Sequence, residues 1–439
     1  MVDADVLIVG AGPAGLAAAL VFEGSNHRII HVEARNRIGG RTHTLAVGPH
    51  QSIDVGAHWL HASKANPLVR EAKNLGIALS SANQWPVVMD GEATLNTWRQ
   101  MRLWRAWRKI DRAIVRLANE PVGLSAQRAV DQTDRWQVLA GELHGNHACG
   151  THLSNVDATD FSNALDSEDC FVEGGYGALV TAAGHTANPR LGVSVQRIVQ
   201  VADGVRAETT AGDIAARALI LTVPITVIAN GSIRFDPGLP ESHAQAADDL
   251  PHGAYERLVF TLGNDPFSKE KDRAVIMLNT ENKVFYLLAG AGGRGVHFAD
   301  FGADEGRNLA AKGINAMADC VKLWLSSHLG AVVAKTLTPL YATSWTTDPL
   351  TLGGWSVARP GKAAARIALQ EPIANRIWFA GEATSVEQWG TVGGAWLEGM
   401  RAAADVKRAL LPGGQSREWF SDRKKFKAIV HKARPRNLT

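Results

Sequence analysis

The chain has 439 residues, of which 46% are hydrophobic and 20% are charged, and its formal net charge is +3. This balance excludes a fibrous or broadly disordered protein, and the length favours two domains around a shared ligand. The cysteines Cys149, Cys170 and Cys320 are widely spaced and odd in number. They support neither a disulfide framework nor a closed zinc site, so a reducing, cytoplasmic setting is expected.

Charge is distributed unevenly along the chain. Between residues 417 and 439, eight lysines and arginines stand against two acidic residues, and removing this +6 leaves about −3 for the rest. The basic C-terminal tail, 413–439, is either a solvated terminus or a contact for an anionic partner or membrane surface. Because the body is slightly acidic, no nucleic-acid partner is expected. The N-terminal apolar run lacks a basic flank and no later segment has the length of a membrane span, so neither an export signal nor a membrane span is expected.

The first motif in the chain is a short apolar strand followed by a glycine turn. Residues 5–9 (DVLIV) are typical of a buried parallel strand, and they lead into Gly10, Gly12, Gly15 and the helix-forming LAAAL. In such a unit Gly10 permits the sharp turn, Gly12 lets the backbone approach a pyrophosphate, and Gly15 lets the helix pack closely on the strand. The positive end of the helix would face the phosphates, so the motif predicts a dinucleotide site.

A second predicted strand, RIIHV, ends at Glu33, whose carboxylate can accept both hydroxyls of an adenosine ribose. Ala34 and Arg35 follow, and an IGGR segment then brings Gly40 and Arg41 just beyond the acidic strand end. The two glycines allow the backbone of this second segment to approach the pyrophosphate and ribityl chain, and the arginine supplies a permanent positive charge there. This extension resembles the FAD sites of the glutathione-reductase-like flavoproteins and indicates FAD rather than NAD.

Four further blocks follow in the order SIDVGAHWLHASKANPLVREAKNLG (52–76), FVEGGYGALV (171–180), ALILTVPITVI (218–228) and IWFAGEATSVEQWGTVGGAWLEGMRAA (377–403). Together they resemble the flavin amine oxidases, the superfamily of monoamine oxidases, polyamine oxidases, L-amino acid oxidases and lysine-specific histone demethylases. The likeness runs from residue 3 to about 410 and is weak between about 80 and 168.

The resemblance implies an α/β, two-domain flavoprotein. A glutathione-reductase-like, Rossmann-like FAD domain is expected from residues 1–78, 168–237 and 343–412, with a mostly parallel sheet. An interleaved α+β substrate-binding domain is expected from residues 79–167 and 238–342. The active site would lie between the two domains, as ligand pockets commonly do.

The resemblance also carries cofactor contacts onto individual residues. Thr391 and Val392 begin the helix TVGGAWLEG, whose first N–H groups would face the pyrimidine end of the flavin. A helix N-terminus there stabilises the negative charge that reduced flavin carries near N1 and O2. The other implied contacts are Gly56, Ala57 and His58 along the flavin ring, Val195 at adenine, and Gly381 and Glu382 beside the ribityl and pyrophosphate portion.

Amine oxidases of this superfamily hold an uncharged amine between two aromatic side chains beside the flavin. The resemblance places Trp355 and Trp396 at these two positions and Trp345 against the flavin. Indole faces bind electron-rich or cationic nitrogen and exclude water from the reacting carbon. His61, in HWLHA, matches the active-site histidine of many polyamine oxidases and could accept an amine proton. Core packing for the tryptophans and a structural role for the histidine remain the alternatives.

Two positions depart from the pattern of the family. Monoamine oxidases attach FAD through a cysteine where this chain has Gly354, so noncovalent FAD is expected. Most members carry a lysine that holds a water near flavin N5, whereas the register of HGAYERLVF puts Arg257 there. Arginine keeps its charge and presents a planar fork, which leaves open an acceptor other than oxygen.

Residues 98–118 predict an amphipathic helix with tryptophans on one face and arginines on the other. This helix either covers the core, roofs the substrate cavity or docks on an anionic surface.

We expect an FAD-dependent amine oxidase that removes a hydride from the carbon next to an amine nitrogen. The product is an imine and then an aldehyde, and O2 is reduced to H2O2. The alternatives are an L-amino acid oxidase, although HWLHA lacks the expected arginine, an amine dehydrogenase with another acceptor, a carbon–carbon desaturase, and a flavin-stabilised binding protein without turnover. The expected partners are a small-molecule amine and O2, and the oligomeric state stays open, a homodimer included.

Overall fold

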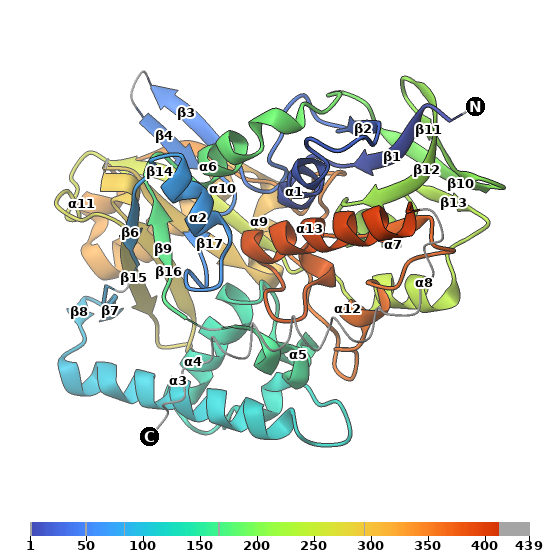
Figure 1. Ribbon diagram of the computed structural model, residues 1–439. Coiled ribbons are helices and arrows are strands. Elements are labelled where there is room, and N and C mark those ends of the chain that lie inside the picture. Colours follow the sequence, from blue (N-terminus) through green and yellow to red (C-terminus); the bar gives the residue numbers. More distant parts are fainter. Residues whose placement is uncertain (1, 49–50, 83, 166, 294, 412–439) are drawn as a thin grey trace.

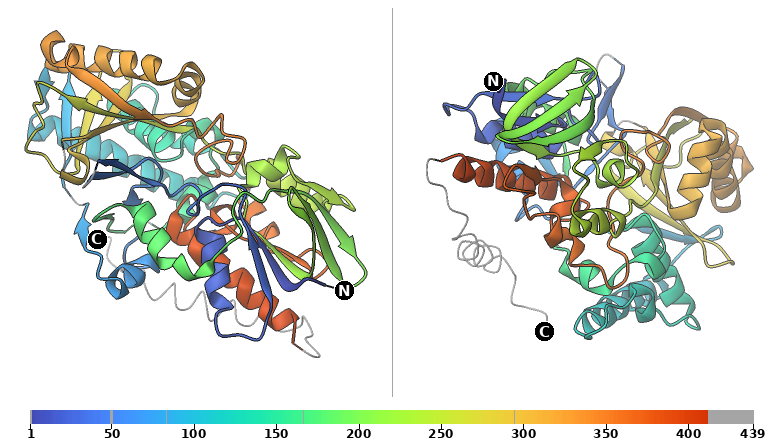
Figure 2. Two further views of the ribbon diagram at one scale, coloured as in Figure 1. Left: turned by 90° about the horizontal axis from the view of Figure 1, so that it is seen from above. Right: turned by 90° about the vertical axis from the view of Figure 1, so that its right-hand side faces the viewer.

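The computed structural model describes residues 2–48, 51–82, 84–165, 167–293 and 295–411. The chain folds into two lobes that lie side by side, and each lobe is built around a seven-stranded sheet (Figures 1 and 2). The predicted basic tail, 413–439, lies outside the described residues. Among the described helices, none combines the length and apolar character needed to cross a bilayer.

The first sheet carries the predicted nucleotide motif. Its order is β13-β10-β11-β12-β1-β2, and β19 pairs with β12. Pairing is parallel for β2-β1-β12-β19 and antiparallel for β10-β11-β12. Val6 and Ile8 face one apolar cluster and Leu7 and Val9 face another, so the run is apolar throughout because both faces of the sheet are covered. The strands are β1 (Ala4–Val9), β2 (Ile29–Val32), β10 (Val195–Val201), β11 (Gly204–Thr209), β12 (Gly212–Leu221), β13 (Arg234–Asp236) and β19 (Ile377–Phe379).

Two helices from opposite ends of the chain cover one face of this sheet. Helix α1 (Pro13–Val21) lies against α13 (Val392–Ala409), as Figure 1 shows. A Cβ at Gly399 would lie 2.0 Å from the carbonyl oxygen of Ala14, so the two backbones approach within a distance that only glycine allows. The other face packs against α7 (Ile225–Ala229), α8 (Glu241–Asp248) and α12 (Ala365–Ala368).

The second sheet has the order β18-β14-β17-β16-β15-β7-β8. It is antiparallel apart from the parallel pair β15-β7. Leu258 and Phe260 face helix α10 (Ile314–Leu329), whereas Val259 faces the opposite cluster, as the two-residue period of a strand requires. The strands are β7 (Val87–Asp90), β8 (Ala93–Thr94), β14 (Tyr255–Leu262), β15 (Arg273–Leu278), β16 (Val284–Ala289), β17 (His297–Gly302) and β18 (Leu337–Ala342).

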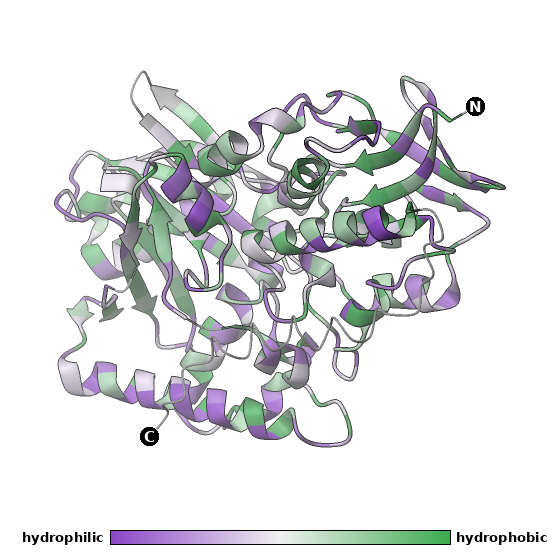
Figure 3. Ribbon diagram, in the orientation of Figure 1, coloured by the Kyte–Doolittle hydropathy of each residue, from purple (hydrophilic) through white to green (hydrophobic). Residues whose placement is uncertain are grey.

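Helix α3 (Thr97–Leu117) is the predicted amphipathic helix, and Figure 3 shows hydrophilic and hydrophobic residues alternating along it. Asn96 caps it by accepting a hydrogen bond from the Arg99 N–H. The prediction that the apolar face starts at the first turn of this helix is wrong. Trp98 is 72% exposed and Met101 is 37% exposed. The buried stripe begins one turn later, at Leu103, where α3 reaches α4 (Arg135–Glu142) and α5 (Ala158–Asn163).

The remaining elements are shorter strands, helices and turns outside the two large sheets. They are β3 (Thr44–Gly48), β4 (Gln51–Asp54), β5 (Trp59–Leu60), β6 (Leu79–Ser81), β9 (Cys170–Val172), α2 (Leu68–Asn74), α6 (Tyr176–Ala183), α9 (Ala303–Lys312), α11 (Ala331–Ala334), the 3₁₀ turns η1 (Ala126–Ala129), η3 (Leu153–Asn155), η4 (His185–Ala187), η5 (Ala291–Gly293) and η6 (Glu382–Thr384), and the π-helical turn η2 (Leu143–His147). The division into an FAD domain and a substrate domain at the predicted boundaries remains a proposal, with which the membership of the two sheets is consistent.

Candidate active site

One cavity of about 1220 Å³ is lined by residues of both lobes. This volume exceeds the 300–1,000 Å³ of an ordinary small-molecule pocket. It is large enough for an extended dinucleotide together with a second ligand. The predicted site residues that line it are Gly10, Gly12, Glu33, Ala34, Arg35, Gly40, Arg41, Gly56, Ala57, His58, His61, Val195, Arg257, Trp345, Trp355, Gly381, Glu382, Thr391 and Val392.

The glycine turn after β1 forms one end of the cavity. Gly10 has a φ of +99°, and a Cβ at Gly15 would lie 1.8 Å from the Gly10 carbonyl oxygen. Gly15 is not among the residues that line the cavity, and its missing side chain permits α1 to pack against the turn. Glu33 accepts hydrogen bonds from the N–H groups of Ala11, at 2.7 Å, and Arg35, at 2.8 Å. These bonds fix its carboxylate at the end of β2.

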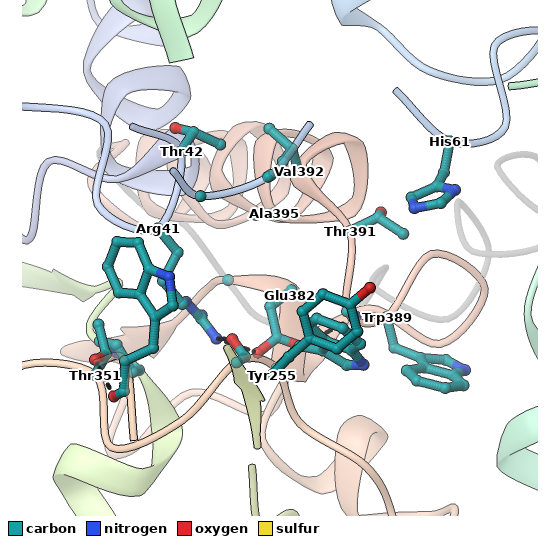
Figure 4. A pocket seen from close by; sticks show the side chains of 18 of the residues that line it. Arg41, Thr42, His61, Tyr255, Thr351, Glu382, Trp389, Thr391, Val392 and Ala395 are labelled. Atoms are coloured by element: carbon teal, nitrogen blue, oxygen red, sulfur yellow. Dashed lines mark hydrogen bonds and ion pairs between the residues drawn. The ribbon is translucent and has the colours of Figure 1, made fainter. Parts of the chain in front are cut away.

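An ion pair joins the N-terminal segment to the C-terminal segment at the middle of the cavity (Figure 4). Arg41 donates to Glu382 at 3.1 Å and to the carbonyl of Gly354 at 2.5 Å. Glu382 also accepts from Ser356 and from the N–H of Gly390. Although burial opposes ionisation, the neighbouring arginines and these donors lower the pKa of Glu382 to about 2. Its carboxylate is therefore charged across the physiological range.

Arg257 fixes the backbone beside the predicted flavin ring. Its Nη1 donates to the carbonyls of Asp54 and Gly56, at 3.0 and 3.2 Å. Its Nε and Nη2 donate to the two carboxylate oxygens of Asp300, at 2.6 and 2.9 Å. Burial opposes the charge, but Asp300 more than offsets it and raises the pKa of the guanidinium. The guanidinium is thus held in one geometry by four hydrogen bonds.

The imidazole of His58 lies in a buried polar site next to this backbone. Its Nδ1 is 2.9 Å from a carboxylate oxygen of Asp54, and its ring contacts Phe171 and Phe298. Burial lowers the pKa of His58, but the carboxylates of Asp272, 3.7 Å from Nε2, and of Asp54 outweigh it and raise the pKa. The His58 side chain is therefore held by other protein groups in the wall of the cavity. Gly56 and Ala57 line the cavity with their backbone atoms.

Trp345 lies against the same backbone on another side. Its Nε1 donates to the carbonyl of Val55 at 3.2 Å. Glu256 is fully buried and accepts from the N–H groups of Trp345 and Thr346, which holds the loop after β18 in place. Alternation along β14 thus sends Glu256 to this loop and its neighbour Arg257 to the cavity.

Three aromatic side chains line the cavity near the start of α13. The rings of Tyr255 and Trp355 are 4.9 Å apart at 46°, and the Tyr255 hydroxyl donates to Asp300 at 3.1 Å. The indole of Trp389 donates to the carbonyl of Asp160 at 2.9 Å. In Figure 4, Tyr255 and Trp389 lie across the open space from Thr391 and His61.

The prediction that Trp396 forms a wall of the amine site is wrong. Its side chain is 3% exposed and packs with Leu16, Leu60 and Tyr176 in the core between α1, α2 and α6. The physical reason is its depth in α13, because Thr391 caps the helix and only the first turn reaches the cavity.

His61 lies at the edge of the cavity. It is 48% exposed on its side chain, its Nδ1 is 2.9 Å from Asp169, and its ring stacks on Trp59 at 11°. An exposed, paired histidine at this position can contact a ligand only near the entrance.

Helix α3 forms the roof of the cavity, one of the three roles that its sequence allows. Trp104, Trp107 and Asp111 line the cavity from this helix. The ring of Trp107 lies 3.8 Å from that of His144, and His144 Nε2 is 2.7 Å from a carboxylate oxygen of Asp111. His144 belongs to the π-helical turn, a form of helix that is frequent at functional sites.

Several lining residues were not predicted from the sequence: Tyr255, Trp389, His144, His147 and Tyr286. Tyr255 carried a usable signal, because it is two residues before Arg257 on a strand and so shares its face. No comparable signal marks the π-helical turn.

Comparison with known proteins identifies the family. A family model for flavin containing amine oxidoreductases matches residues 90–407. The chain belongs to this family. A second model, for NAD(P)-binding Rossmann-like domains, matches residues 8–72 of the amine oxidoreductase. The predicted family, two-domain α/β fold and flavin cofactor are confirmed.

Similar proteins include demethylases and polyamine oxidases. Lysine-specific histone demethylase 1 homolog 2 of Oryza sativa subsp. japonica is 26% identical over 92% of this chain and 57% of its own length. Polyamine oxidase 2 of Arabidopsis thaliana is 25% identical over 92% of this chain and 88% of its own length. The chain thus spans little more than half of the length of the demethylase relative. A putrescine oxidase structure with bound putrescine has a TM-score of 0.76 at 18% identity, covering 92% of this chain and 99% of that chain, and shows the same fold.

The residues that line the cavity of this chain fit FAD. The turn before α1, Glu33, Arg41 and the start of α13 line one continuous cavity. A Cβ at Gly40 would lie 3.2 Å from the Gly12 Cα, so two glycines bring separate backbone segments together beside the cavity. Gly354 has no side chain that could form a bond to the flavin, which is the physical basis for noncovalent FAD at that position.

Proposed function

We propose that this enzyme oxidises the C–N bond of a small-molecule amine and passes the electrons to O2. The observation that carries the proposal is the single cavity in which the fitted FAD site adjoins an aromatic wall. A nitrogen-bearing carbon placed against Tyr255, Trp355 and Trp389 would be shielded from water while it faces the start of α13. Bound FAD supplies the acceptor for the hydride.

The atoms and electrons of the proposed amine oxidation balance as follows. The amine carbon loses a hydride and the nitrogen loses a proton, which gives an imine. Water then converts the imine into an aldehyde and ammonia or a smaller amine. O2 takes up two electrons and two protons and becomes H2O2.

Specific roles follow from the positions of the side chains. We propose that Arg257 holds the backbone of Gly56 against the flavin ring and that Arg41 and Glu382 position the ribityl and pyrophosphate portion. Trp345 and Trp355 hold the ring and the amine, respectively. His61 contacts the substrate at the entrance, because its side chain is half exposed there.

A second candidate is an amine dehydrogenase with a non-oxygen acceptor. The observation in its favour is the permanently charged Arg257 in the wall where the family usually has lysine. L-Amino acid oxidation has weaker support, because the described cations deep in the cavity, Arg41 and Arg257, are already bound by Glu382 and Asp300.

Anaerobic mixing with amines tests the proposal. Stopped-flow spectra should show bleaching of the visible flavin band by monoamines or polyamines, followed by recovery and one H2O2 per turnover when air is admitted. Recovery only with an artificial electron acceptor would favour the dehydrogenase. Bleaching by L-amino acids alone, or no bleaching by any amine, would overturn the proposal.

A further inference from the structure

Each carboxylate that lines the cavity has a hydrogen-bond or ion-pair partner within the described part of the protein. Among the described lining residues, the acidic side chains are Glu33, Asp111, Asp169 and Glu382. Glu33 accepts from two backbone N–H groups, and Glu382 is paired with Arg41. Both belong to the cofactor half. The two acidic residues of the substrate half therefore decide which charges a substrate can bring.

Both of these residues are paired with histidines. Asp169 lies 2.9 Å from His61 Nδ1 and also accepts from the N–H of Ala62 at 3.1 Å. Asp111 lies 2.7 Å from His144 Nε2, while His144 Nδ1 lies 2.8 Å from the Ala140 carbonyl. The imidazole of His144 thus lies between the Asp111 carboxylate and the Ala140 carbonyl, and each of its ring nitrogens is within hydrogen-bond distance of an oxygen. Each carboxylate of the substrate half therefore already has a histidine partner inside the protein.

The exposed α3 side of the cavity, which we call its mouth, carries positive charge. Arg108 and Arg112 line the cavity from the exposed side of α3. Within the described part of the chain, no carboxylate forms an ion pair with either of them. The cavity lining also includes the large apolar side chains of Trp104, Phe161 and Ile276. A second ammonium on a substrate would meet cations at the entrance and an apolar wall inside, and an unpaired buried charge is costly.

We infer that the substrate is an apolar or aromatic monoamine, whose only cationic group is the reacting nitrogen, and that Arg108 and Arg112 select against diamines and polyamines. This inference rests on the proposed amine oxidation. It assigns selectivity to the electrostatics of the mouth, independently of the residues that contact the flavin.

The test compares kcat/KM of the FAD-loaded enzyme for 2-phenylethylamine, putrescine and spermidine at low ionic strength. The unmodified enzyme should prefer 2-phenylethylamine by at least about tenfold. The double variant R108E/R112E changes the mouth by four charge units, which at roughly 10 Å should raise kcat/KM for putrescine about tenfold. The effect should shrink when salt is added. The matched control is R102E/R105E, with the same charge change on exposed residues of α3 that do not line the cavity.

The outcomes distinguish a failure of the selectivity from a failure of the proposed function. A preference of the unmodified enzyme for putrescine or spermidine would overturn the inference and leave amine oxidation intact. The inference is also overturned if R108E/R112E behaves like R102E/R105E. If no amine reduces the flavin, the proposed function itself fails, and the inference with it.

Discussion

Replacing Asp300 with asparagine tests whether the buried ion pair with Arg257 organises the active-site wall. Both side chains are almost completely buried, with exposed fractions of 6% for Arg257 and 0% for Asp300. D300N keeps the shape of the side chain but leaves the guanidinium without a counter-charge. Removing one partner of a buried pair typically costs about 3–5 kcal/mol, and we expect a loss of this size in the free energy of unfolding.

The assay is guanidinium unfolding followed by tryptophan fluorescence, at one saturating FAD concentration because bound ligand adds to stability. The exposed pair Arg206–Asp213 provides a control, since its N···O distance of 2.6 Å equals that of the buried pair. D213N should change stability far less, because solvent screens the pair. The double variant R257M/D300L removes both charges and should recover most of the loss. A D300N effect no larger than that of D213N would refute the reasoning.

Two further predictions concern the C-terminal side of the cavity. A Cβ at Gly390, where φ is +68°, would lie 2.8 Å from Trp355 Cδ1. G390A should therefore lower kcat/KM for the amine by displacing this indole, whereas G76A, with the same φ and open space around it, should leave kcat/KM unchanged. The pKa of Glu382 is depressed from 4.5 to about 2, so its pairing with Arg41 stabilises the fold above about pH 4.5 and is lost as the pH falls toward 2. Acid titration of unfolding should show a smaller loss over this window for E382Q than for the unmodified enzyme; equal slopes would contradict the assignment.

Features made by residues close together in the sequence could be predicted, whereas contacts between distant segments could not be predicted from residue spacing. The strand, glycine turn and Glu33 form a local unit, so residue spacing alone indicated the dinucleotide site. The pairing of Arg41 with Glu382 joins segments 341 residues apart, and only the resemblance to a family brought them together.

The misassigned Trp396 shows a different limit. The sequence indicated that a helix begins near Thr391, but whether the first or the second turn faces the ligand depends on the direction of its axis. Tertiary packing sets that direction, through contacts such as Gly399 with α1. Similarly, the π-helical placement of His144 depends on its partners, Asp111 and Trp107, on another helix.

The contact between α1 and α13 has a consequence for biogenesis. During translation, β1 and the glycine turn leave the ribosome long before α13 and Glu382 are made. Until then, the apolar side of α1 lacks its cover and the FAD pocket lacks one wall. The complete pocket is therefore available to a cofactor only late in synthesis.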